Sequence, residues 1–225
     1  MKLYKFRSLE NWVYTKDILE NSRLFCAKHR DLNDPFEGFF FRFVSQEGGI
    51  IGSVIGSVIG STIGSVIGGG TTKRYSEIEK LPNYDENTRV CSLSKSLSDI
   101  RLWSYYANDH KGLAIELELE EGDTNLHEVI YSGGISDLKE MIKPKTSIAQ
   151  ILQYKTDHWA HEQEYRLITN SEYYSVTGKI TGVYFGIRTP QDMKEQVLEV
   201  LPSGTAAYET KVNPKEANIG VGRKL

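Results

Sequence analysis

The 225-residue sequence has few of the residues that mark the commoner kinds of functional site. Its two cysteines, Cys26 and Cys91, are too few for a disulfide framework and lack the spacing of a zinc site, so we expect them to be reduced and buried. The five histidines form no HExxH pattern, and no metal site is expected. No Walker loop, glycine-rich dinucleotide fingerprint or GxSxG motif occurs. These absences exclude many common enzyme classes.

Neither sign of charge dominates, because the formal net charge is only −3. The chain therefore has no general attraction for nucleic acid or for an anionic membrane, and we expect stable binding to neither. The first residues, MKLYKFRSLENW, lack the apolar stretch of a secretory signal, so a cytoplasmic location is expected. The contents of 39% hydrophobic and 25% charged residues are those of an ordinary globular protein.

One segment, residues 48–70, consists of an uncharged Ile-Gly-Ser-Val repeat with one Thr variant. As a helix it would carry a stripe of glycine, and as a strand it would be open to stacking between chains. We favour an insert that the surface tolerates, with assembly of a homo-oligomer through the repeat as the alternative. Membrane crossing is disfavoured, because it would separate the two flanking parts of one domain. The expected organisation is a single catalytic or binding domain over 1–205, with this insert, and an irregular tail over 206–225.

Hydrophobic periodicity predicts a mixture of strands and helices. Alternation of apolar and polar residues predicts strands at 2–7, 89–94 and 113–119. Helical spacing predicts a helix that is capped by Ser98 and ended by His110-Lys111-Gly112, and a second helix over 148–161. These elements follow no regular β-α-β order. The predicted fold is therefore α+β, with a mixed, largely antiparallel sheet and flanking helices.

Two pairs of polar residues are candidates for chemistry. Glu162 and Glu164, if extended, project from one face, where one carboxylate could stabilise a cationic sugar-like transition state while the other orients a nucleophile. The alternative is a solvated edge in which Arg166 is their charge partner. Ser92 and Ser94 share a face in the same way, and their hydroxyls could hydrogen-bond a ligand and a nearby carboxylate.

The predicted helix between Ser98 and Gly112 carries an aromatic stripe. Trp103, Tyr106 and His110 fall at spacings that share one helical face, which is typical either of a core or of a ligand platform. His110 could cap the helix carbonyls, interact with the helix dipole or reach into a cleft.

Arg7 follows two aromatic residues on the first predicted strand. If the side chain points inward it needs an anion, because an unpaired buried charge is costly. Asp34, Glu37 or a phosphate could supply that negative charge.

Five motifs in order resemble the bacterial family catalogued as domain of unknown function 2971. They are YKFR at 4–7, LF at 24–25 with LNDPFE at 32–37, CSLS at 91–94, WxxYAxxHxG at 103–112 and WxHExEYR at 159–166. The resemblance spans roughly residues 3–190 apart from the glycine repeat. It implies a family but no activity.

A looser resemblance is to ADP-ribosyltransferases of the Arg-Ser-Glu type. These enzymes carry an arginine on the first strand, a Ser-x-Ser on a later strand and a Glu-x-Glu near the start of another. Here the same chain order is met by Arg7, by Ser92 with Ser94, and by Glu162 with Glu164. Leu93 stands where the family usually has a hydroxyl residue. The resemblance implies a sheet split in two as one arrangement of the fold.

The second resemblance also implies roles around NAD, which would be a substrate. Arg7 would hold its phosphate and ribose side, and Ser92 would position the nicotinamide ribose. Glu164 would bind that ribose and stabilise the oxocarbenium-like state, while Glu162 would orient the acceptor. Cofactor contacts would come from Arg7, Ser92, Ser94, Trp103, Tyr106 and His110.

The expected function is therefore that of an NAD-using ADP-ribosyltransferase or NAD glycohydrolase-like protein, such as a toxin or a phage-defence effector. Its acceptor is not indicated by the sequence. Two alternatives stay open, a non-catalytic nucleotide-binding sensor and a self-assembling interaction module. The arrangement of Arg7, Ser92 and Glu164 in space separates these hypotheses, because the enzyme hypothesis places them in one pocket.

Overall fold

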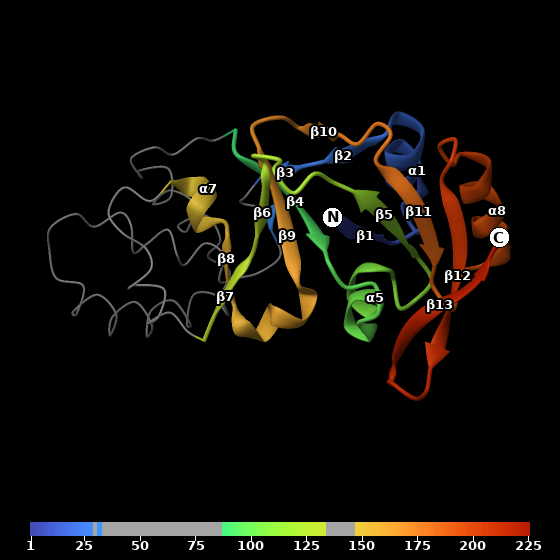
Figure 1. Cartoon of the computed structure of the whole chain (residues 1–225). Coiled ribbons are helices and arrows are strands. Elements are labelled where there is room, and N and C mark those ends of the chain that lie inside the picture. Colours follow the sequence, from blue (N-terminus) through green and yellow to red (C-terminus); the bar gives the residue numbers. More distant parts are fainter. Residues whose placement is uncertain (29–30, 33–86, 134–146) are drawn as a thin grey trace, which may run out of the picture. The chain divides into compact units, whose positions relative to one another are not determined.

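The computed structural model describes residues 1–28, 31–32, 87–133 and 147–225 (Figure 1). The glycine repeat and the loop that carries Asp34 and Glu37 lie outside the described residues, so the hypotheses made for them stay predictions. The chain divides into two compact units where the sequence predicts a single domain. Unit 1 comprises 1–26, 89–128 and 160–225, and unit 2 comprises 27–88 and 129–159.

Unit 1 is built on a large sheet. Its strands are β1 (Lys2–Arg7), β2 (Arg23–Phe25), β4 (Arg89–Ser94), β5 (Leu113–Glu118), β6 (Leu126–Glu128), β9 (Glu164–Thr169), β10 (Tyr173–Ser175), β11 (Ile180–Phe185), β12 (Ala206–Asn213) and β13 (Asn218–Lys224). Its helices are α1 (Trp12–Asn21), α5 (Ile100–Tyr106) and α8 (Gln191–Glu199). A 3-10 helix, η2 (Asp157–Glu162), leads into β9.

The sheet of unit 1 runs in the order β13-β12-β11-β5-β1-β4-β9-β6. Along this path β11 and β12 are parallel, and the other neighbouring strands are antiparallel. The predicted α+β class with a largely antiparallel sheet is confirmed. These strands follow one continuous path, and the short pair β2–β10 lies apart from it as a two-stranded sheet.

The register of the central strands defines two faces of the sheet. Tyr4 of β1 pairs with Ser94 of β4, and Ser94 pairs with Glu164 of β9, so these three side chains share a face. We call it the α5 face, because α5 packs there. Since side chains alternate along a strand, the residues one or three positions away, such as Leu93 and Arg7, belong to the opposite side, which we call the α1 face.

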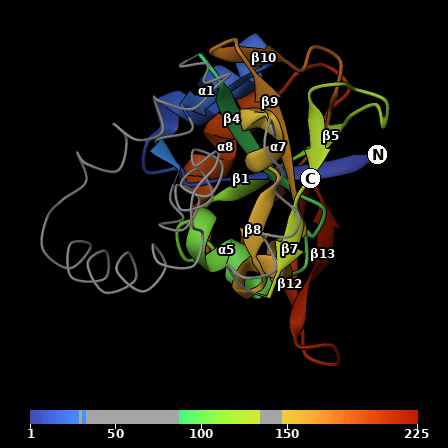
Figure 2. The ribbon, with the colours of Figure 1, turned by 90° about the vertical axis from the view of Figure 1, so that its left-hand side faces the viewer.

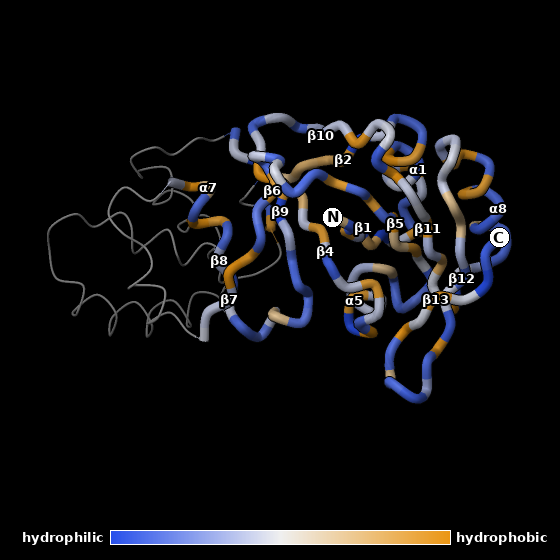
Figure 3. The backbone as a smooth tube through the Cα atoms, in the orientation of Figure 1, coloured by the Kyte–Doolittle hydropathy of each residue, from blue (hydrophilic) through white to orange (hydrophobic). Residues whose placement is uncertain are grey.

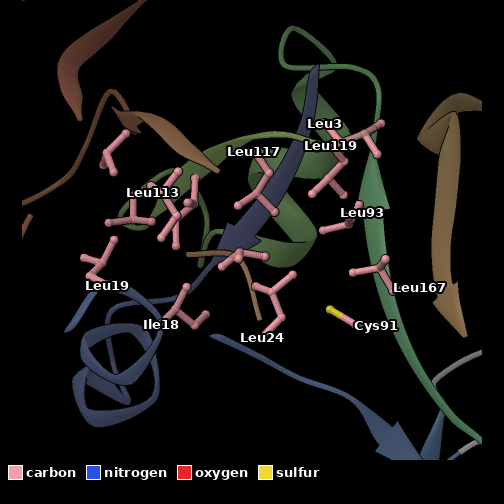
Figure 4. Packing of buried hydrophobic residues seen from close by; sticks show 14 of the residues in the cluster. Leu3, Ile18, Leu19, Leu24, Cys91, Leu93, Leu113, Leu117, Leu119 and Leu167 are labelled. Atoms are coloured by element: carbon pink, nitrogen blue, oxygen red, sulfur yellow. The ribbon is translucent and has the colours of Figure 1, made fainter. Parts of the chain in front are cut away.

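The α1 face holds the main apolar core. Leu3, Leu93 and Leu167 from three neighbouring strands pack with Ile18 and Leu19 of α1. Figure 4 shows the leucine side chains and the sulfur of Cys91 gathered in this one layer. Full burial of each leucine contributes about 1.5–3 kcal/mol, so this layer dominates the stability of unit 1.

The α5 face holds a smaller, aromatic core. Phe6 packs edge-on against Trp103 of α5, with ring centroids 5.0 Å apart. Further along the sheet, the rings of Tyr184 and Tyr208 stack at 5.0 Å. Because tyrosine and tryptophan carry a polar atom as well as a large apolar ring, this face combines packing with hydrogen bonding.

The segment 206–225, expected to be irregular, instead contains the whole of β12 and β13. β12 adds to β11 in parallel, with Ala207 beside Val183, and β13 folds back on β12. The resulting hairpin reaches beyond its neighbours in two perpendicular views, and its tip is hydrophilic (Figures 2 and 3). The local pattern is weak because only scattered positions such as Ala207 and Ile219 are buried.

Unit 2, as far as it is described, contains β3 (Ala27–Lys28), β7 (Ile130–Ser132), α7 (Ile148–Ile151) and β8 (Tyr154–Thr156). The predicted continuous helix over 148–161 is wrong: only its first turn is α-helical, β8 follows, and the residues from Asp157 belong to the 3-10 helix η2. α7 begins with a capping box between Ser147 and Gln150, but the chain then enters β8, which pairs in parallel with β7. Pairing with a strand distant in sequence overrode the helical spacing.

Candidate functional site on the α5 face

Helix α5 brings a tyrosine to the Glu-x-Glu segment. Asp99 caps the helix by accepting a hydrogen bond from the Arg101 amide at 2.9 Å. One end of the helix then presents Tyr106, whose hydroxyl donates to Oε1 of Glu162 at 2.6 Å. A hydrogen bond to an ionised acceptor is stronger than a neutral one, so this contact fixes the carboxylate.

The turn between the two glutamates is held by β4. The Ser94 hydroxyl donates to the Glu162 carbonyl at 2.6 Å, and the Lys95 amide donates to the Gln163 carbonyl at 3.0 Å. Gln163 has a left-handed φ of 44°, so the chain bends sharply here. Glu162 therefore ends η2 while Glu164 begins β9, so the pair lies at a helix-to-strand junction and the condition for a shared strand face, that both residues are extended, is not met.

Glu164 forms a buried ion pair with Arg166. Nε and Nη2 of the guanidinium donate to the two carboxylate oxygens at 2.8 and 3.2 Å, and the side chains are 3% and 1% exposed. The two residues share a face because they are two apart on β9. Ser94 pairs with Glu164, and Ser92 pairs with Arg166. Arg166 is therefore a charge partner, as the alternative interpretation of the sequence expects. The ion pair with Glu164 is buried, however, and does not lie at a solvated edge.

The α5 face thus gathers several predicted site residues. Two carboxylates, one guanidinium and three hydroxyls come from α5, β4, the end of η2 and β9; they belong to Ser92, Ser94, Tyr106, Glu162, Glu164 and Arg166. Hydroxyls can donate and accept, and carboxylates can accept, so the set has the chemistry to bind a ribose. Ser92 and Tyr106 are only partly buried, which leaves them within reach of a ligand.

Arg7 does not join this set. It lies three residues beyond Tyr4 on β1, so it points to the α1 face while Ser94 and Glu164 point to the α5 face. Its Nε is buried and has no hydrogen-bond partner in the part of the chain that the structure describes. Burial lowers the pKa of its guanidinium. The predicted single pocket of Arg7, Ser92 and Glu164 is therefore not formed.

Trp103 belongs to the core instead of a ligand platform. Its side chain is fully buried, its indole N–H donates to the Leu97 carbonyl at 2.7 Å, and its ring packs on Phe6. The His110 ring stacks on the Trp103 ring, with centroids 6.4 Å apart and planes 7° apart. His110 is 6% exposed, and burial lowers its pKa. Both residues are thus enclosed by protein.

The WxxYAxxHxG motif encodes a tight loop. Three successive residues, Asn108, Asp109 and His110, have left-handed φ values of 47°, 53° and 67°. The Gly112 amide donates back to the Ala107 carbonyl at 2.8 Å. A Cβ at Gly112 would lie 2.1 Å from the Arg7 carbonyl oxygen. The motif's tryptophan, alanine and glycine therefore have structural roles, and Tyr106 is the member that reaches the candidate site.

Sequence reasoning missed a buried carboxylate, Glu116 of β5, on the same face. It is 3% exposed and accepts four hydrogen bonds, from Lys2 at 3.0 Å, Tyr4 at 3.2 Å, Thr181 at 2.7 Å and Tyr184 at 2.9 Å. Alternation in LAIELEL assigns Glu116 to the polar side of the strand, so no local signal indicates its burial. With four donors the carboxylate is saturated, so Glu116 holds the sheet together and has no acceptor left for a ligand.

Burial and hydrogen bonding shift the pKa of Glu116 in opposite directions. Burial tends to raise the pKa of Glu116, but hydrogen bonds from Thr181, Lys2 and Tyr184 outweigh it and leave the pKa below its ordinary value. Burial, together with the neighbouring carboxylate, raises the pKa of Tyr4 to about 12. Glu116 therefore stays ionised and Tyr4 stays protonated at neutral pH.

No protein-family model, curated protein or solved structure matches this chain. Across the described ranges, no group of three or more His, Cys, Asp or Glu side chains is placed to hold a metal ion. Within the same ranges, none of the helices has the length and apolar character needed to cross a membrane.

Proposed function

We propose that the α5 face beside β4 and β9 binds a ribose-containing nucleotide, with NAD as the first candidate, and that the protein cleaves the nicotinamide–ribose bond by transfer or hydrolysis. One observation carries the proposal. The Ser94 hydroxyl fixes the Glu162 carbonyl, and Ser94 pairs directly with Glu164, so one serine of a Ser-x-Ser strand positions both residues of a Glu-x-Glu segment.

The role that we assign to each residue follows from its neighbours in the structure. Breaking the nicotinamide–ribose bond develops positive charge on the sugar, which a preorganised carboxylate stabilises. Glu164 is preorganised by Arg166, and Glu162 is preorganised by Tyr106. The partly buried Ser92 supplies a hydroxyl for the ribose. Arg7, which faces the other side of the sheet, is not part of the proposed site.

The test measures nicotinamide release from NAD by the purified chain. We expect release by the natural sequence and a loss of about 100-fold or more in Glu164→Gln, because that change removes the ionised carboxylate. Glu195→Gln, at an exposed position of α8, is the matched control and should leave the rate unchanged. Equal rates in Glu164→Gln and the natural sequence would exclude the proposed catalytic role.

Tyr106→Phe tests the role of the carboxylate at Glu162. It removes the hydroxyl that holds Oε1, and a reduction of about tenfold in the rate corresponds to the loss of one hydrogen bond of about 1.4 kcal/mol. Tyr105→Phe is the control, because Tyr105 is 62% exposed on the same helix. A lower rate in both variants would mean that the effect does not pass through Glu162.

A nucleotide-binding sensor is the second candidate, and the Glu164–Arg166 ion pair favours it. A carboxylate already paired in two places with a buried guanidinium is less available to a cationic sugar. Thermal unfolding with and without NAD separates the candidates. Stabilisation by NAD without release of nicotinamide supports the sensor, and release supports the enzyme.

A further inference from the structure

The end of β1 carries an arginine that the proposed nucleotide site leaves out. Arg7 pairs with Leu113 of β5, a member of the apolar layer on the α1 face, so the arginine side chain lies on that face as well. Its Nε is buried, and no hydrogen bond or ion pair reaches the guanidinium within the described part of the chain. A cation held out of water without an anion is costly, so Arg7 requires a negative charge that these residues do not supply.

Two further cations belong to the same face. Lys5 precedes Arg7 by two residues, which is about 7 Å along β1, and therefore points to the same side. One N–H of its ammonium donates to the Ser92 carbonyl at 2.9 Å, and an ammonium has three such donors. On β4, Arg89 donates from Nη1 to the carbonyl of Cys26, a residue of the apolar layer, at 3.3 Å. Positive charge therefore gathers where β1 and β4 meet the α1 face.

The carboxylates around this end of β1 do not neutralise Arg7. Glu10, in the turn after β1, is exposed and forms no ion pair with Arg7. On α1, Asp17 forms its ion pair with Arg23 at 2.7 Å. Glu172 faces the arginine of β4 at 3.8 Å. Each of these acids is therefore either solvated or engaged with another cation.

Two titratable groups interact electrostatically with Arg7, and neither is a carboxylate. They are Cys91 of β4 and Tyr14 of α1. A thiol and a phenol are neutral when protonated, and burial of Cys91 in the apolar layer favours its protonated form. An anion from solution is therefore the missing partner of the guanidinium.

The start of α1 lies against the end of β1 and leaves a route from solvent. The hydroxyl of Thr15 donates to the Ser8 carbonyl at 3.3 Å, which ties the first turns of α1 to the residue after Arg7. Tyr14, in the first turn, is 64% exposed, and Arg7 is only partly buried. An anion can therefore reach the guanidinium at this end of the sheet.

We infer that Arg7 is the centre of an anion-binding site on the α1 face, and that this site takes a phosphate group. A guanidinium presents its donors in a planar fork that binds two oxygens of a phosphate at once, and the charges of Lys5 and Arg89 suit a dianion. The site lies on the opposite face of the sheet from Glu162 and Glu164, so it does not depend on the proposed function.

The experiment measures thermal unfolding of the full chain in sodium phosphate and in sodium chloride of equal ionic strength. A ligand that binds only the folded chain raises the unfolding midpoint, and at ten times the dissociation constant we expect a rise of about 3 °C or more. Glycerol 3-phosphate, which lacks a ribose, is titrated in parallel. A larger rise with the ester identifies a phosphate ester as the ligand, and a larger rise with inorganic phosphate identifies the free anion.

Arg7→Met removes the charge and keeps an unbranched side chain. The response to phosphate should vanish, while the midpoint in chloride should equal or exceed that of the natural chain, because a cation without a partner is removed. Arg223→Met, at a 72% exposed side chain on β13, is the matched control and should keep the full response. Cys91→Ala should also keep the response, because its thiol is not the counter-ion of Arg7.

Three results would overturn the inference. The natural chain could show no difference between phosphate and chloride. Arg7→Met could keep the phosphate response, which would then be a general salt effect. Alternatively, phosphate could stabilise Cys91→Ala but not the natural chain, which would make a thiolate at Cys91 the internal partner of Arg7. None of these variants changes Glu162 or Glu164, so this inference and the proposed cleavage of NAD fail independently.

Discussion

Glu116 and Leu117 are neighbours on β5, yet different forces hold them because they face opposite sides of the sheet. Leu117 is fully buried in the apolar layer of the α1 face. Glu116, on the α5 face, is buried almost as deeply but is stabilised by four hydrogen-bond donors. Burial alone therefore does not identify an apolar core. Leu117 is buried by apolar packing, whereas Glu116 is buried because hydrogen-bond donors surround its carboxylate.

The same division separates two groups of side chains in unit 1. Cys26, Cys91 and Arg7 belong to the α1 face, while the carboxylates of Glu162 and Glu164 lie on the α5 face with their partners. β4 contributes to both groups, because Cys91 and Ser92 are consecutive and point to opposite sides. One short strand therefore supplies side chains to both faces.

The largest effect is expected where the end of β1 meets the loop after α5. Gly112→Ala would place a Cβ 2.1 Å from the Arg7 carbonyl oxygen, a contact that only a backbone shift relieves. We expect a loss of about 3 kcal/mol or more in the free energy of unfolding, which affects both faces together. Gly122→Ala is the control, because nothing lies within 4 Å of its added Cβ. Urea denaturation of the two variants measures the difference, and equal stabilities would contradict the packing described.

Leu117→Ala disturbs the α1 face alone. Removing a fully buried leucine side chain costs about 2–5 kcal/mol through lost burial and the cavity left behind. Because no ionisable group is lost, this cost should be the same at pH 7 and at pH 4. Urea denaturation at both pH values tests it, and a strong pH dependence would show that the two faces are coupled.

Glu116→Gln disturbs the α5 face and should have the smallest effect, about 1–3 kcal/mol at pH 7. The folded pKa of Glu116 lies below the ordinary value of 4.5, so the ionised carboxylate stabilises the fold above that value, and this contribution is lost as the pH falls through the folded pKa. The difference from the natural chain should therefore shrink in acid. Glu118→Gln, exposed on the same strand, is the control, and a difference that stays constant with pH would refute the account.

Several elements could be predicted from the sequence because their patterns are local. The strands at 2–7, 89–94 and 113–119 appear close to the predicted positions. α5 begins near the predicted Ser98 cap, but it ends at Tyr106 and not at His110, because the residues from Asn108 to His110 take left-handed backbone conformations. Alternation in LAIELEL indicates a strand but not the burial of Glu116, and the apolar spacing around Trp103 indicates a buried helical face. The expectation that both cysteines are free and buried is confirmed as well.

Other features depended on partners far along the chain. β8 replaced the predicted helix because β7 offers it a parallel neighbour, and residues 206–213 became a strand because β11 pairs with them. Long-range strand pairing also separated Arg7 from Ser92 and Glu164, which lie on the other face of the sheet. The order Arg7, Ser92, Glu164 in the chain says nothing about which face each residue takes once the strands are paired.

The sequence by itself determined which residues alternate within each strand, and so that Ser92 and Ser94 share a face while Cys91 takes the other. Only the tertiary structure decided how those alternations are aligned between strands, because register is set by long-range pairing and a shift of one residue exchanges the faces. That alignment placed Arg7 with the thiols, brought Tyr106 to Glu162 and enclosed Trp103 in the core.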